Sequence, residues 1–140
     1  MKNVIYPVLI LLFTIFQSCD KCDNEDGKWE AMKWENEIQI SDYNNIIVPG
    51  AGGEYTFSCL NYSPWLINAT EISKNNYKEF IRSSDSYKIE TSFASIKIIN
   101  KKLIVTILPN GTPERTLKVF VTAGDVFANF TFNQGTLLCY

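Results

Sequence analysis

The sequence has no histidine among its 140 residues. A serine or cysteine nucleophile that depends on a histidine base is therefore excluded. A pair of carboxylates, as in glycosidases, needs no histidine, but none of the 15 acidic residues lies in a recognisable catalytic motif. We predict that the protein is not an enzyme.

Signals for phosphate, metal and nucleic acid are missing too. Gly50, Gly52 and Gly53 are followed by neither the helix nor the lysine of a phosphate-binding loop. The chain contains no D-x-D-x-D-G calcium loop, so its turn acids are expected to be solvated. Residues 28–140 hold eleven acidic and eleven basic residues, which leaves no excess positive charge for nucleic acid. We predict no cofactor, no bound metal and no nucleic-acid partner.

Long hydrophobic runs are scarce, and the chain has a single uncharged one at its start, Val4 to Phe16. This run is shorter than the roughly 20 residues that span a bilayer, and it fits the core of a signal peptide. Ser18 before Cys19 resembles the lipobox of bacterial lipoproteins, although Phe16 stands where that motif usually has leucine. We predict a lipoprotein signal peptide at residues 1–18 and a lipid on Cys19, with an ordinary cleaved secretory signal as the alternative.

Cys19 and Cys22 also form a C-x-x-C pair, which is found in redox and zinc sites. A redox pair lies at the start of a helix, whereas acidic residues follow here and would raise a thiol pKa. Zinc needs two further ligands, and only the isolated Cys59 and Cys139 remain. Both interpretations are weaker than lipidation. After lipidation an odd number of cysteines is left, and we predict that Cys59 is a buried thiol that does not pair with Cys139.

The residues that follow Cys19 are strongly acidic. Residues 20–27 hold four acids and one lysine, a net charge of −3, and such a composition indicates a solvated tether. The stretch resembles the acidic export signals of surface lipoproteins in some Gram-negative bacteria, and a plain spacer is an equal alternative. We place the lipidated N-terminus and tether at residues 19–33.

From Lys28 onward the dominant period of the hydrophobic pattern is two, which is typical of half-buried antiparallel strands. Apolar residues alternate in five segments, with inward positions expected at Trp34, Ile38 and Ile40; Tyr55, Phe57 and Cys59; Trp65, Ile67 and Ala69; Leu117, Val119 and Val121; and Val126, Ala128, Phe130 and Phe132. Turn residues separate the segments at 49–53, 99–102, 109–113 and 123–125. One stretch, 75–82, has helical spacing and predicts a short helix. The pattern predicts an all-β sandwich or barrel of seven to eight strands.

Two stretches resemble BACON domains. Residues 52–67, G-G-E-Y-T-F-S-C-L-N-Y-S-P-W-L-I, are similar to a glycine-strand-Asn-Trp-Leu pattern of that family. Residues 108–134 are similar to its end, where Arg115, Gly124 and Gln134 match the family's arginine, turn glycine and final glutamine. The resemblance implies an Ig-like antiparallel β-sandwich at residues 34–140, interrupted by an insertion at 71–87. It also implies a bacterial surface protein found beside carbohydrate-active modules.

Aromatic residues make up 14% of the chain, and exposed rings are platforms on which sugars stack. The candidates are Trp29, Tyr43, Tyr62, Trp65 and Tyr77. Trp34 and Trp65 fall on apolar faces and are expected in the core, whereas Trp29 and Tyr62 are expected at the surface. Trp29 and Tyr62 are therefore the predicted carbohydrate-binding residues.

These observations predict a non-enzymatic cell-envelope lipoprotein with a carbohydrate-associated β-sandwich. Its partners would be the membrane, through the lipid on Cys19, and neutral glycans. It would be anchored in a bacterial outer membrane, on the cell surface or facing the periplasm. The alternative function is a structural or protein-interaction accessory lipoprotein that docks on an outer-membrane partner.

Overall fold

The computed structural model describes residues 28–82, 84–111 and 113–135. The predicted signal peptide, the lipidation site at Cys19, the acidic residues 20–27 and the cysteines Cys22 and Cys139 lie outside the described residues. Among the described residues, no helix is long and apolar enough to cross a membrane.

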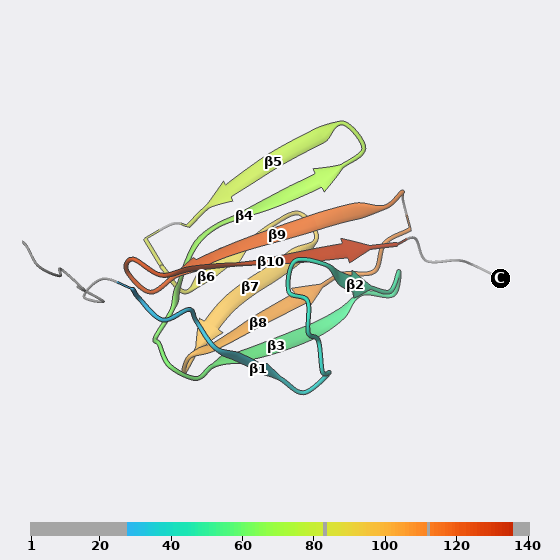
Figure 1. Ribbon diagram of the computed structural model, residues 1–140. Helices are drawn as coiled ribbons and strands as arrows, with labels where there is room; N and C mark the ends of the chain where they lie inside the picture. The colour runs from blue at the N-terminus through green and yellow to red at the C-terminus, as the bar shows by residue number, and fades with distance from the viewer. Residues whose placement is uncertain (1–27, 83, 112, 136–140) are drawn as a thin grey trace, which may run out of the picture.

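The described chain forms ten strands in two five-stranded sheets that face each other (Figure 1). The strands are β1 (Trp34–Asn36), β2 (Ile46–Val48), β3 (Gly53–Cys59), β4 (Trp65–Ser73), β5 (Asn76–Ile81), β6 (Lys88–Glu90), β7 (Ala94–Ile99), β8 (Lys102–Ile107), β9 (Arg115–Thr122) and β10 (Phe127–Gln134). One sheet has the order β1-β3-β8-β7-β6 and the other has the order β2-β10-β9-β4-β5. The fold is an all-β, two-sheet sandwich, as the sequence predicts, with more strands than the expected seven to eight.

The core lies between the two sheets and is built from the inward positions of alternating strands. Tyr55, Phe57 and Cys59 on β3 are buried, as are the three predicted positions of β9 and, on β10, Phe130 and Phe132. Phe57 contacts Phe130 and Phe132 across the sheets, with ring centroids 4.8 and 6.1 Å apart. The period-two prediction is confirmed on these strands, and burial of these side chains is the main source of stability.

The predicted turns lie between strands as expected. Asn100 and Lys101, which join β7 to β8, both have positive φ values, 49° and 65°, as a two-residue hairpin turn requires. Gly52 also has a positive φ, and a Cβ there would lie 2.1 Å from the carbonyl oxygen of Ile107. Glycine is therefore required at this turn.

On β4 the predicted face is wrong in its first half. Leu66 is completely buried, whereas Trp65 and Ile67 are half-buried. The pairing with β9 shifts between Leu66 and Asn68, and a bulge of one extra residue reverses the faces on either side of it. Ala69, beyond the bulge, is buried as predicted.

Two other local predictions are wrong. Residues 76–81 form strand β5, which pairs with β4 through a tight turn at Lys74, and not a helix. Strand β1 ends at Asn36 and Gln39 has a positive φ, so Ile38 is exposed. At β5, pairing with β4 overrides the local helical pattern. After β1, the Asn36 side chain accepts from the Ile40 N–H and donates to the Ile40 carbonyl, and these two bonds turn the chain out of the strand.

The strands run between two ends of the sandwich, which lie on opposite sides in Figure 1. The tether end comprises residues 28–33, 60–64, 81, 82, 84–87, 99–102 and 122–127. The far end comprises residues 49–53, 73–77, 91–94, 108–111, 113–115, 134 and 135. Strand β10 runs toward the far end and pairs in parallel with β2.

Candidate functional site

A hollow of about 470 Å³ lies at the far end, where the β4–β5 hairpin extends beyond the opposite sheet. It is lined by Glu71, Ser73, Asn76, Tyr77, Lys78, Ser92, Phe93 and Arg115. The lining comes from β4, β5, the β6–β7 loop and the start of β9. A concave surface that combines aromatic rings with polar side chains is the usual form of a small-ligand site.

Glu71 forms the inner wall of the hollow. It is buried, and its carboxylate accepts a hydrogen bond from the Ser92 hydroxyl and another, of 3.2 Å, from the Phe93 backbone N–H. These donors satisfy a charged group that would otherwise be costly to bury. Glu71 therefore fixes the β6–β7 loop against β4.

Arg115 also lines the hollow. Its guanidinium lies 3.8 Å above the centre of the Phe93 ring. Its Nε donates to Gln134 Oε1 (2.8 Å), and its Nη2 donates to the carbonyl oxygens of Leu108 (2.9 Å) and Pro109 (3.2 Å). Burial lowers the pKa of Arg115 and the negative charge of Glu71 opposes that effect, and the group stays cationic at neutral pH.

The same contacts explain two of the residues on which the BACON resemblance rests. Gln134 is buried and donates from Nε2 to the carbonyl of Leu108 at 2.9 Å. Arg115 and Gln134 therefore bind the same loop carbonyl and hold the β8–β9 connection at the far end. Their role in this structure is to support the base of the hollow.

Tyr77 borders this hollow and also a second one. The second hollow, of about 300 Å³, lies on the outer face of the sheet and is lined by Ile67, Asn68, Thr70, Ile72, Tyr77, Lys118 and Phe120. The Tyr77 side chain is 68% exposed. The sequence identified Tyr77 as a candidate platform but placed it on a helix, because Tyr77, Phe80 and Ile81 have helical spacing. The charged Glu79 between Tyr77 and Ile81 leaves no period-two pattern that would have predicted a strand.

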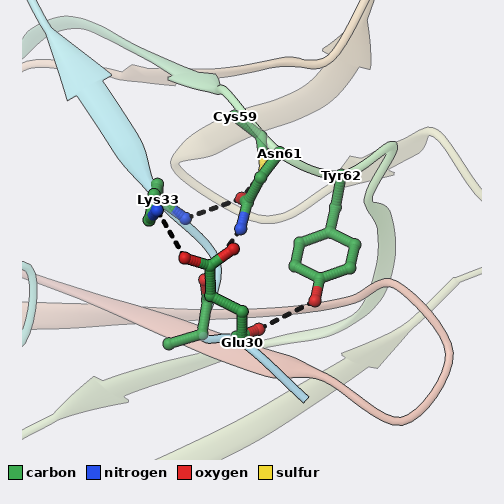
Figure 2. Close-up of polar contacts among 6 residues, drawn as sticks. Glu30, Lys33, Cys59, Asn61 and Tyr62 are labelled. Atoms are coloured by element: carbon green, nitrogen blue, oxygen red, sulfur yellow. Dashed lines mark hydrogen bonds and ion pairs between the residues drawn. The ribbon is translucent and has the colours of Figure 1, made fainter.

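The predicted residues Trp29 and Tyr62 lie at the tether end, away from the hollow. Trp29 is 66% exposed. Tyr62 is half-buried, and its hydroxyl donates to the Glu30 carbonyl at 2.8 Å, as Figure 2 shows. The Tyr62 phenol thus holds the last residues of the predicted tether against the sandwich, and the structure brings neither residue near Tyr77.

Asn61, which sequence reasoning missed, binds the same segment (Figure 2). Its amide donates to the Ala31 carbonyl and accepts from the Lys33 N–H, both at 2.9 Å. The Leu60 N–H donates to the Lys33 carbonyl, also at 2.9 Å. Glu30 forms an ion pair with Lys33. That pair, through its hydrogen bond first and its charge second, lowers the pKa of Glu30.

Trp34, which was expected in the core, and the candidate Tyr43 both have structural roles. Trp34 is half-buried and contacts Phe130 edge-on at 5.1 Å. Tyr43 is half-buried, and its hydroxyl donates to the Trp34 carbonyl at 3.0 Å. Within residues 28–82, 84–111 and 113–135, no group of three or more Cys, Asp or Glu side chains is placed to hold a metal ion.

No protein-family model matches the sequence, and no curated protein matches it either. Among solved structures, the chain is similar to a protein from Bacteroides thetaiotaomicron whose structure was determined by NMR, with 26% identity and a TM-score of 0.70. The match covers 85% of this chain and 98% of that protein. The M1 domain of titin matches at 12% identity and a TM-score of 0.43, over 76% of this chain and 95% of that domain. The likeness to the Bacteroides protein shows that a bacterial protein shares this sandwich over almost its whole length.

Proposed function

We propose that the protein is a non-enzymatic, lipid-anchored module of the bacterial cell envelope that binds neutral glycans at the far end of a BACON-like, Ig-type sandwich. The anchor is the lipid on Cys19, and the outer-membrane surface is the proposed location. The observation behind the binding proposal is the exposed ring of Tyr77 on the border of two hollows.

Tyr77 has the surroundings that a stacked sugar needs. A flat exposed ring binds the apolar face of a pyranose, and neighbouring polar side chains bind its hydroxyls. Ser73 and Asn76 supply such groups in the first hollow. Because both hollows meet at Tyr77, an oligosaccharide has room to extend to either side of a sugar stacked on the ring.

The charges in the hollow favour an uncharged ligand. Arg115 is engaged by Gln134, by loop carbonyls and by the Phe93 ring. Lys78 lies over the Phe80 ring, with its Nζ 4.7 Å from the ring centre. Glu71 is already hydrogen-bonded. These three charged side chains already interact with other groups of the protein, so they are not free to pair with a charged ligand. One ring and a few hydrogen bonds support weak binding, with a Kd of about 1 mM, or about −4 kcal/mol.

The test is titration of the purified protein, held in lipid nanodiscs, with a panel of neutral oligosaccharides by calorimetry or NMR. Tyr77→Ala should weaken binding at least about tenfold, or about 1.4 kcal/mol, with an unchanged melting temperature because the ring is exposed. The matched control is Tyr87→Ala, which removes an exposed tyrosine at the tether end and should leave binding intact. Trp29→Ala tests the residue that the sequence predicted.

Three outcomes separate the possibilities. Loss of binding in Tyr77→Ala alone supports the far-end site. Loss in Trp29→Ala alone moves the site to the tether end. If the wild-type protein binds no neutral glycan at millimolar concentration, the alternative takes its place: an accessory lipoprotein that docks on an outer-membrane partner.

A further inference from the structure

The loops of the tether end are hydrogen-bonded to one another and to residues 30–33, the last residues of the predicted tether. The Cys59 N–H donates to the Lys101 carbonyl at 3.0 Å, which joins the β3–β4 and β7–β8 connections. The Leu66 N–H donates to the Ser86 carbonyl and the Ile98 N–H donates to the Tyr87 carbonyl, each at 2.8 Å. Together with Asn61 and Tyr62, these bonds make the tether end one continuous surface.

Large exposed apolar side chains gather on this surface. Among the described residues, ten large hydrophobic side chains are exposed. Six of them lie on the tether end: Trp29, Leu60, Ile81, Tyr87, Ile99 and Phe127. At the far end there are two, Tyr77 and Leu108, and the remaining two, Ile38 and Ile47, lie on one flank. Single exposed apolar residues need no explanation, but a concentration of them at one end indicates a contact surface.

The charges among these apolar residues are mainly positive. The tether end holds the basic residues Lys28, Lys33, Arg82, Lys101 and Lys102, against the acids Glu30, Asp85 and Asp125. Glu30 is paired with Lys33. Aromatic and aliphatic side chains interspersed with lysines are typical of surfaces that enter the headgroup region of a membrane, where the rings and alkyl stems bury and the ammonium groups bind phosphate.

The position of the proposed lipid anchor indicates that the bilayer is the partner of this surface. Lys28 is nine residues after Cys19, and a fully extended chain of that length reaches at most about 30 Å. The described chain enters the fold at the tether end, where Glu30, Ala31 and Lys33 are hydrogen-bonded. The tether end is thus the part of the sandwich held nearest to any bilayer that contains the lipid.

We propose that the tether end rests on the bilayer that carries the anchor, with Trp29, Leu60, Ile99 and Phe127 in contact with the headgroup region. This inference rests on the lipid anchor of the proposed function. It gives the sandwich a fixed orientation in which the hollow at the far end faces away from the membrane. The occupant is the phospholipid surface, and a second envelope protein is an outcome of the test.

The test uses the full lipidated protein in vesicles of phosphatidylethanolamine and phosphatidylglycerol, with a fraction of the lipid brominated near the glycerol backbone. Bromine quenches nearby tryptophan fluorescence. We expect quenching in the wild-type protein, and we expect Trp29→Phe to remove most of it because Trp29 is the most exposed tryptophan. The triple variant Leu60→Ser, Ile99→Thr, Phe127→Ser should reduce the quenching of Trp29 by detaching the surface. The matched triple variant Ile38→Ser, Ile47→Thr, Leu108→Ser should not.

Fatty-acid labelling of wild type and of Cys19→Ala separates the two proposals. Labelled, vesicle-bound protein whose Trp29 is not quenched would overturn the resting orientation while the anchor stands, and would leave this surface to a protein partner. Absence of labelling in the wild type would overturn both. Equal quenching in the two triple variants, with equal melting temperatures, would also overturn the orientation.

Discussion

At the scale of single residues, the Asn61 side chain makes the two hydrogen bonds that a neighbouring strand would otherwise make to residues 31–33. Its side-chain amide donates to Ala31 and accepts from Lys33, in the way a neighbouring backbone would. The segment at 30–33 is thereby bound to the β3–β4 connection without a β-ladder of its own. The Glu30–Lys33 ion pair lies on the exposed side of this attachment.

The attachment should weaken in acid. The pKa of Glu30 is lowered below its ordinary value of 4.5, first by the hydrogen bond from Lys33 and then by its charge. A carboxyl whose pKa is depressed by folding contributes its full stabilisation above the unfolded pKa, and the contribution is lost as the pH falls through the folded pKa. NMR titration should therefore give a Glu30 midpoint below 4.5, accompanied by shifts of the Lys33 and Leu60 amides.

Two variants test the cause. Lys33→Met should return the Glu30 midpoint toward 4.5, and Glu30→Gln should abolish the acid-dependent shifts of the Lys33 and Leu60 amides. A wild-type midpoint at or above 4.5 would contradict the ion pair. Because the carboxylate is solvent-exposed, the midpoint should also move upward with added salt.

At the scale of elements, the bulge in β4 decides which side chain enters the core. Leu66→Ala should cost about 2–5 kcal/mol, since it leaves a cavity at a completely buried position. Trp65→Ala should cost less, although it removes more atoms, because Trp65 remains half-buried. Urea denaturation of the two variants measures both values. A larger loss for Trp65→Ala would mean that the strand follows the uninterrupted alternation.

Strand pairing explains which buried positions could be predicted from the sequence and which could not. Alternation placed Phe57, Val119 and Phe132 correctly because β3, β9 and β10 pair without interruption. It failed at Trp65, because an extra residue in β4 breaks the period of two. It also failed at Tyr77, because residues with helical spacing pair with the free edge of β4 and form a strand. The bulge depends on the pairing of β4 with β9, which is distant in sequence, and β5 forms because the edge of β4 is open to it. A local hydrophobic pattern reports neither effect.

The hollow at the far end was beyond sequence reasoning for a related reason. Glu71, Ser92 and Arg115 are separated by more than twenty residues at each step, and only the sheet order brings them together. Trp29 was predictable as exposed because it precedes the first strand. Tyr62 was predicted at the surface because it lies in a loop. Its hydroxyl donates a hydrogen bond to the Glu30 carbonyl, and no sequence motif predicts that contact.

At the scale of the whole molecule, the sandwich separates Cys59 from the end of the chain. Cys59 is a free, buried thiol at the tether end of β3. The described chain ends at Gly135 at the far end, and four more residues to Cys139 reach at most about 14 Å. The length of β3 alone, Gly53 to Cys59, is about 20 Å. A disulfide needs Cα atoms within about 7 Å, so this pair could form only if the four residues ran fully extended straight back along β3. We therefore predict that Cys59 and Cys139 stay unpaired.

Peptide mapping under non-reducing conditions checks this prediction. Cys59 should also react with a thiol reagent only after denaturation, because its side chain is buried. A fragment that links residues 59 and 139 would mean that the end of the chain folds back along the sandwich.

The parallel pairing of β2 with β10 has a mechanical consequence. Ile46–Val48 and Phe132–Gln134 point the same way, so opposite pulls on the two ends of the chain slide these strands along each other. All the hydrogen bonds of the pair are then loaded at once, whereas a peeling force would break them one at a time. Strand β1 is loaded in the same manner against β3, since it runs away from the tether end. A domain tethered at one end and holding a ligand at the other would carry tension along its strands, the direction in which a sheet resists force best.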